Sequence, residues 1–98
     1  MATITWTIQA RCDLRRVHDY ISDHGAPETA GRFTDALAAS VGRLQKSPKR
    51  GTILPEADDP NFRHLRFRSY RIVYRIEGGT VFILRIWHHR RLLTHDDL

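Results

Sequence analysis

The sequence is poor in the residues on which several classes of protein depend. It has one cysteine, Cys12, which cannot form an internal disulfide. None of its apolar runs approaches the ~18 residues of a membrane-spanning helix. Its first residues show no basic region followed by an apolar stretch, so no signal peptide is visible. We expect a single domain, residues 1–98, located in the cytoplasm and without a membrane partner.

Cofactor and metal motifs are also missing. The six histidines have no spacing typical of a zinc site, and the single cysteine adds no ligand pair. No serine stands beside a histidine as a nucleophile would, and there is no glycine-rich phosphate loop. The sequence therefore predicts neither a metal nor a cofactor.

The first half of the chain has the period of two helices. Residues 3–7 favour a short strand, and Thr7 is placed to cap the helix that follows. Apolar residues then recur at steps of three and four over 8–24 and again from Pro27 to about Lys46. Gly25 fits a left-handed C-cap between them. The residues expected to face the core are Leu14, Val17, Ile21, Phe33, Leu37 and Leu44.

The second half has the alternation of strands. Residues 51–61 contain two prolines and predict a loop, with a brief extended piece at 52–54. Strands are expected over 63–68, 70–77 and 81–88, with Gly78 and Gly79 as a two-residue turn. That turn pairs Arg75 with Phe82 and brings Arg71 near His88. Arg85 interrupts an apolar face, so either the register contains a bulge or Arg85 reaches water at the end of the sheet.

These elements define an α+β fold. Two helices joined by a short link form an antiparallel hairpin, and their apolar stripes need a surface to cover. The expected architecture is a two-helix hairpin packed on a small antiparallel β-sheet, in the order β-α-α-β-β-β. The other face of the sheet is left for arginines.

The positive charge is concentrated in the last third of the chain. Residues 62–91 contain eight arginines and one acid, Glu77, whereas the formal net charge of the whole chain is +5. This distribution favours an anionic partner. Fourteen of the sixteen basic residues are arginine. That excess suits phosphate or carboxylate recognition, but a GC-rich genome would also produce it.

Five residues are candidates for binding an anionic partner: Arg71, Arg75, His88, Arg90 and Arg91. Together they could clamp a phosphate or several carboxylates, although each arginine could also be simply solvated. Glu56, in the loop, could act as a base, pair with one of these arginines, or be solvated.

The chain resembles toxins of the RelE/ParE superfamily of bacterial type II toxin–antitoxin systems. The similarity begins with Ile4-Thr5-Trp6-Thr7, Asp13-Leu14 and Tyr20-Ile21. It continues through Pro48 and Gly51, which match a Pro-x-x-Gly motif, and the segments 63–65 and 70–76. It ends with residues 83–88 and the pair Arg90-Arg91.

The resemblance implies two kinds of target. ParE-like members block DNA gyrase without a catalytic set, whereas RelE-like members are ribosome-dependent endoribonucleases that cut mRNA. Many of those nucleases use a C-terminal tyrosine, and no tyrosine follows Tyr74 here. We expect a ParE-like gyrase inhibitor that is not an enzyme. In the nuclease alternative Arg71, His88, Arg91 and Glu56 would be catalytic.

The resemblance also implies a cognate acidic antitoxin that covers the basic surface, in a complex that can grow into a higher-order hetero-oligomer. Two readings outside these classes stay open. The chain could bind its antitoxin without being toxic, or it could be a plain nucleic-acid-binding module.

Overall fold

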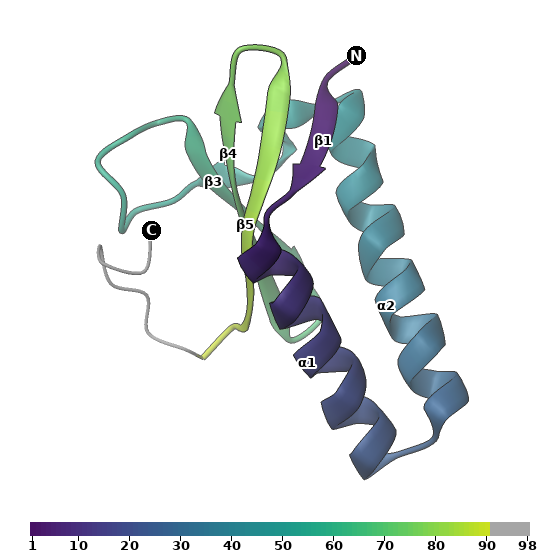
Figure 1. Cartoon of the computed structure of the whole chain (residues 1–98). Helices are drawn as coiled ribbons and strands as arrows, with labels where there is room; N and C mark the ends of the chain where they lie inside the picture. The colour runs from purple at the N-terminus through teal and green to yellow at the C-terminus, as the bar shows by residue number, and fades with distance from the viewer. Residues whose placement is uncertain (91–98) are drawn as a thin grey trace.

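The structure, a computed structural model, describes residues 1–90. A short strand leads into two long helices, and a two-stranded hairpin and further strands complete the sheet (Figure 1). The elements are β1 (Thr3–Trp6), α1 (Ile8–His24), α2 (Pro27–Gly42), the short 3-10 helices η1 (Arg43–Gln45) and η2 (Pro48–Arg50), β2 (Thr52–Ile53), β3 (Phe62–Phe67), β4 (Tyr70–Glu77) and β5 (Thr80–His88). The expected α+β fold is confirmed.

The sheet has five strands in the order β1-β5-β4-β3-β2. Neighbours are antiparallel from β5 to β2, as expected. The exception is β1, which pairs parallel with β5 and makes the sheet mixed. β1 and β5 are the first and last strands of the chain, so segments from opposite ends of the described sequence lie side by side in the sheet.

Thr7 joins the first strand to the first helix. Its hydroxyl accepts a hydrogen bond from the backbone N–H of Ala10 at 3.2 Å, which is the expected N-cap. The same hydroxyl donates to the carbonyl of Ile83 at 2.7 Å. Gly25 does end α1, but its φ of −156° and ψ of −136° are not left-handed, so that expectation was wrong. Pro27 opens α2 at its first turn, as predicted.

The helix hairpin covers one face of the sheet. Val17, Leu37 and Leu44 are buried there against Ile72, Tyr74 and other strand residues, as the helical stripes predicted. Leu14, Ile21 and Phe33 are only partly buried at the margin of this core. The stripe was therefore assigned to the correct face, but three of its six residues lie at the margin of the core and not inside it.

The opposite face of the sheet carries a second, smaller core. Leu54, Val73 and Trp87 are buried there, with Ala57, Phe62 and Leu84 packed around them. The loop after β2 therefore covers part of the face that the sequence had left entirely to arginines. The remaining part of this face carries Arg66 opposite Arg71 across β3 and β4.

A bulge in β5 changes which side chains share a face. From Glu77 opposite Thr80 to Tyr74 opposite Ile83, the pairing follows the predicted turn. The register then shifts, so that Val73 pairs with Arg85 and Arg71 with Trp87, not with Leu84 and Ile86. Trp87 consequently lies in the second core, on the face of the sheet opposite Tyr74.

The bulge also explains Arg85. Its guanidinium lies 4.2 Å from the ring centroid of Trp87 on the loop-covered face, and it reaches the carboxylate of Asp13 on α1. Asp13 is 3% exposed and also accepts a hydrogen bond from the backbone N–H of Ile86 at 3.0 Å. The carboxylate thus occupies the edge of β5 where β1 has already turned into α1.

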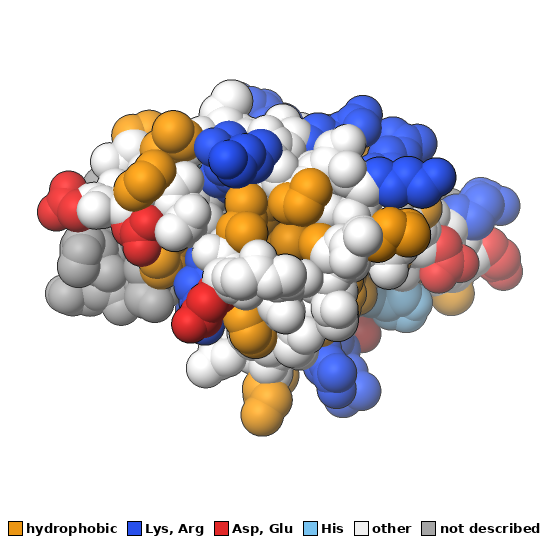
Figure 2. Space-filling view, turned by 90° about the horizontal axis from the view of Figure 1, so that it is seen from above, with side chains coloured by type: hydrophobic (Ala, Val, Ile, Leu, Met, Phe, Trp, Pro, Cys, Tyr) orange, Lys and Arg blue, Asp and Glu red, His pale blue; other side chains and the backbone are white. Residues whose placement is uncertain are grey.

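The surface charge is less one-sided than the sequence suggested. In Figure 2, Lys and Arg side chains form several separate groups, with hydrophobic side chains between them and acidic ones at the sides. Arg71, Arg75 and Arg85 each pair with a carboxylate, from Glu56, Glu77 and Asp13. In residues 1–90 no helix is both long enough and apolar enough to cross a membrane.

Candidate functional site

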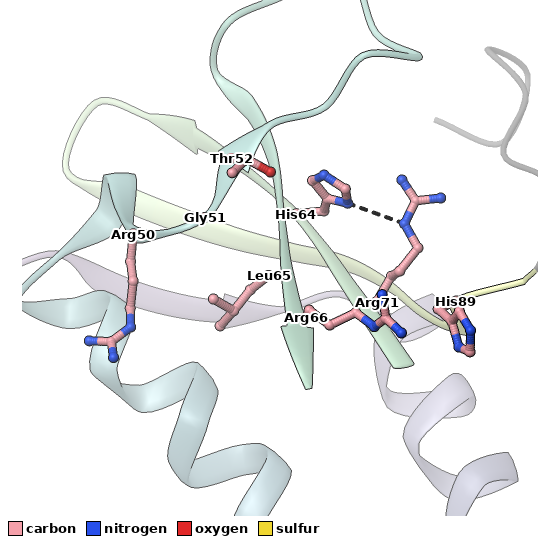
Figure 3. A pocket seen from close by; sticks show the side chains of 8 residues that line it. All are labelled: Arg50, Gly51, Thr52, His64, Leu65, Arg66, Arg71 and His89. Carbon is pink, nitrogen blue, oxygen red and sulfur yellow. Dashed lines mark hydrogen bonds between the residues drawn. The ribbon is translucent and has the colours of Figure 1, made fainter. Parts of the chain in front are cut away.

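A basic pocket of about 340 Å³ opens at the outer edge of β3 (Figure 3). β2 pairs with β3 only at His64 and Arg63, so the edge beyond His64 is left without a strand partner from β2. The pocket is lined by Arg50, Gly51, Thr52, His64, Leu65, Arg66, Arg71 and His89. Its wall therefore combines three arginines and two histidines with no carboxylate.

A buried tyrosine fixes the wall of the pocket on the η2 side. The hydroxyl of Tyr74 donates to the carbonyl of Pro48 at 2.7 Å and accepts from the N–H of Gly51 at 2.9 Å. A Cβ at Gly51 would lie 2.6 Å from the carbonyl oxygen of His64 and 2.7 Å from that hydroxyl. The Pro-x-x-Gly motif thus places Arg50 beside β3, and glycine is needed for space.

Arg71 is the central cation of the site. Its Nε donates to Nδ1 of His64 at 3.1 Å, the bond drawn in Figure 3. Its Nη2 donates to the Glu56 carboxylate, at 3.2 Å to Oε2 and 3.4 Å to Oε1. The side chains of Arg71 and Glu56 are 13% and 27% exposed. The pairing of Glu56 with an arginine was one of its expected roles, and Arg71 is the partner.

His64 is one of the pocket residues that the sequence analysis missed, with Arg50, Arg66 and His89. Burial lowers the pKa of its imidazole, the Arg71 guanidinium lowers it further, and Glu56 partly opposes both effects. Because Nδ1 accepts from Arg71, the neutral ring carries its proton on Nε2. A signal was present in the sequence: His64 alternates with Leu65 on the expected strand, so it lies on the face opposite the core.

His89, and not His88, enters the pocket. His88 pairs with Tyr70 across the sheet and contacts its ring edge-on, with centroids 5.8 Å apart, on the helix side. His89 lines the pocket, and its Nδ1 lies 3.0 Å from the carbonyl of Ser69. The expectation that His88 joins Arg71 was therefore wrong, because it was based on a register without the bulge.

The other candidate arginines lie elsewhere. Arg75 pairs with Glu77 and lies 4.4 Å from the ring centroid of Phe82, so it does not line the Arg71 pocket. Arg90 is exposed just after β5, and its backbone N–H donates to Nδ1 of His88 at 3.3 Å. Arg91 lies outside the described residues. The predicted convergence on one spot is reduced to Arg71, joined by Arg50, Arg66 and two histidines.

The site is equipped to bind oxyanions. Guanidinium groups offer paired donors to phosphate and carboxylate, and imidazole N–H groups add single donors. Within residues 1–90, no group of three His, Cys, Asp or Glu side chains is arranged to hold a metal ion.

A two-helix hairpin on a five-stranded mixed sheet, with a pocket lined by arginines at the β3 edge, defines a small α+β domain with a basic edge. The family model described as "ParE toxin of type II toxin-antitoxin system, parDE" matches residues 4–93. The chain belongs to this ParE toxin family.

The chain is similar in sequence to toxins named RelE and in sequence and fold to a chain of a ParDE system. "Toxin RelE1" of Caulobacter vibrioides is 28% identical over 90 residues, covering 88% of this chain and 91% of that toxin. A chain of the chromosomal ParDE system from P. aeruginosa is 27% identical with a TM-score of 0.78, covering 90% of this chain and 96% of its own length.

Two RelE-type structures are also similar. A chain of the RelBE2 toxin–antitoxin complex from Mycobacterium tuberculosis is 27% identical with a TM-score of 0.60, covering 90% of this chain and 98% of that one. A mutant of the E. coli toxin RelE in the free state has a TM-score of 0.64 at 18% identity, covering 92% of this chain and 86% of its own. The last comparison shows the shared fold alone.

Proposed function

We propose that this toxin acts in the cytoplasm as a ParE-like inhibitor of DNA gyrase and is neutralised by a cognate antitoxin. The match to the ParE family over residues 4–93 and the similarity to the ParDE system of P. aeruginosa support this assignment. Inhibition by binding requires a surface and no bond-breaking machinery.

The observation that carries the proposal is the state of Arg71. Its guanidinium donates both to His64 and to Glu56, so the central cation of the site is already engaged within the chain. General acid–base groups contribute about 10²–10⁴-fold to cleavage rates. No tyrosine follows Tyr74 in the sequence, and Tyr74 itself is buried with its hydroxyl bonded to Pro48 and Gly51. A central arginine already paired within the chain, together with the lack of a free tyrosine as general acid, supports a binding surface.

The antitoxin part of the proposal concerns charge. The similar chains from P. aeruginosa and M. tuberculosis both belong to toxin–antitoxin systems. An acidic antitoxin segment would pair its carboxylates with Arg71, Arg75, Arg90 or Arg91, beside His88, and bury apolar anchors between them. Reversing Arg90 and Arg91 to glutamate should slow association by about 10-fold at low salt. Reversal of Arg11 and Arg15 on α1, the same charge change elsewhere, serves as the control, and equal rates for both pairs would contradict this surface.

The target is tested with purified toxin freed of antitoxin. We expect inhibition of gyrase supercoiling or trapping of cleaved DNA, and no cleavage of ribosome-bound mRNA. Arg32→Ala, an exposed position on α2, is the control variant for both assays. Loss of gyrase inhibition together with robust mRNA cleavage would overturn the proposal.

The second candidate function is a ribosome-dependent endoribonuclease. One observation favours it: Glu56, Arg71 and His64 lie in hydrogen-bonded contact beside a pocket, and a carboxylate, a guanidinium and a neutral imidazole are groups that move protons and stabilise phosphates. In that case Glu56→Gln and His64→Asn should each abolish cleavage in the same assay while the fold is retained.

A further inference from the structure

We propose that the Arg71 pocket is a phosphate-binding site in which the Glu56 carboxylate acts as an internal competitor, so that an incoming phosphate group binds by replacing Glu56 on the Arg71 guanidinium. The free chain would thereby hold its own anion in the place of the ligand. Carboxylate and phosphate oxygens use the same guanidinium donors, which makes the exchange chemically matched.

The charge of the pocket calls for an anion of more than one charge. Arg50, Arg66 and Arg71 line it together with His64 and His89. In residues 1–90 the only carboxylate paired with any of these three arginines is that of Glu56. The Glu56 carboxylate pairs with Arg71 alone, and in Figure 3 the Arg50 side chain points away from Arg71. A phosphate dianion would therefore neutralise the positive charge of this lining more completely than Glu56 does.

The loop that carries Glu56 keeps its shape without the Arg71 contact. The buried side chain of Leu54 anchors it, and its N–H donates to the carbonyl of Phe62 at 2.8 Å. The N–H of Ala57 donates to Leu54, and the N–H of Phe62 to Asp59. The backbone on both sides of Glu56 is thus held by other bonds. The carboxylate can leave Arg71 by rotation of its own side chain, which is 27% exposed.

Arg71 would keep its position when Glu56 leaves. Its Nε remains bonded to Nδ1 of His64, and His64 is on the strand that pairs directly with β4. His64 therefore orients the Arg71 guanidinium, and Glu56 occupies its Nη2 donor. Exchange would free Nη2 without disturbing the bond at Nε, which is the arrangement that a reusable anion site requires.

The test compares phosphate binding by the wild type and by Glu56→Gln, which keeps the shape of the side chain and removes its charge. The probes are inorganic phosphate and a dinucleotide with one phosphodiester, titrated against the backbone and imidazole NMR signals of the isolated chain. If Glu56 occupies Arg71 about nine-tenths of the time, its removal tightens binding about 10-fold. The matched control is Asp58→Asn, which removes the same charge from an exposed position of the same loop.

A tightening in Glu56→Gln that is absent in Asp58→Asn, and that is lost in the double variant Glu56→Gln/Arg71→Gln, supports the exchange. The probe that responds more strongly identifies a free phosphate or a nucleic-acid backbone as the source. Equal affinities of the wild type and Glu56→Gln would mean that Glu56 only holds the loop and would overturn the proposal. An equal gain in Asp58→Asn would overturn it too, as a general charge effect. Gyrase and antitoxin are absent from this measurement, so its result is independent of the proposed target.

Discussion

Asp13 and Arg85, 72 positions apart in the sequence, form a two-point ion pair that closes the edge of β5. Nε of Arg85 lies 2.8 Å from Oδ2 of Asp13, and Nη2 lies 3.1 Å from Oδ1. The carboxylate is 2% exposed, whereas the guanidinium is 22% exposed. Asp13 also accepts a hydrogen bond from the backbone N–H of Ile86. Its side chain therefore bonds the edge of β5 at a point that β1 no longer covers.

Replacing Asp13 with alanine should therefore destabilise the fold by about 3–5 kcal/mol, because it leaves a largely buried guanidinium and a buried N–H without their acceptor. Asp13→Asn keeps an acceptor for Ile86 and should cost less. Urea unfolding followed by circular dichroism measures both. The control is Asp19→Ala, whose carboxylate is 66% exposed and should change stability by less than about 0.5 kcal/mol. A similar small effect at Asp13 would disprove the edge-closing role.

Gly51 and Gly31 should respond in opposite directions to alanine. A Cβ at Gly51 meets a backbone oxygen at 2.6 Å, so Gly51→Ala should destabilise by about 1–3 kcal/mol. Gly31 is inside α2 and has open space around it, so Gly31→Ala should stabilise by about 0.5–1 kcal/mol. Thermal unfolding of the two variants beside the wild type is sufficient. Equal shifts would show that space at Gly51 is not limiting.

Tyr74→Phe removes only a hydroxyl, yet it should lower stability by about 1–3 kcal/mol, because the buried N–H of Gly51 and carbonyl of Pro48 lose their partner. Tyr20→Phe is the matched control, since that side chain is 59% exposed. Burial also raises the pKa of Tyr74. The unfolded chain ionises first, near pH 10, so stability should fall as the pH rises above that value. Tyr74→Phe should show a shallower fall than the wild type.

His64 should make the fold sensitive to mild acid. Its pKa is lowered in the folded chain, so the unfolded state takes up a proton first, below about pH 6.5. The stability that His64 contributes is present above that pH and is lost as the pH falls through the folded pKa. His64→Asn keeps an acceptor for Arg71 and cannot titrate, so its free energy of unfolding should depend less on pH below about 6.5. Identical pH profiles would contradict the assignment.

The sequence predicted the helices and the β4–β5 turn because these depend on local patterns. The stripes through Val17 and Leu37 repeat at helical spacing, and Gly78-Gly79 marks the turn without tertiary information. The burial of Asp13 could not be predicted in this way. Its partner Arg85 is 72 positions distant in the sequence, and a carboxylate on a helix is normally expected to be exposed to solvent.

The candidate site was only partly predictable for a related reason. Arg71 and Glu56 were both identified, because a charged side chain on a strand or in a loop can be recognised as a candidate from the sequence alone. His64 depends on the pairing of β3 with β4, and His89 on the bulge. The alternation of the strand indicates the face on which His64 lies but not its partner Arg71, and nothing in composition or spacing places His89. Arg50 enters the site through the packing of Tyr74 against Gly51.

The bulge at Leu84 has a consequence for comparisons between members of the family. One added residue in β5 changes the face of the sheet on which each side chain from Arg85 to His88 lies. In a relative without that residue, the side chain next in sequence would lie opposite Arg71. This would hold even if the residues around the two histidines were identical in both sequences. Equivalent pocket residues in relatives should therefore be identified from the β4 partner of each residue, and not from its sequence distance to Trp87 and His88.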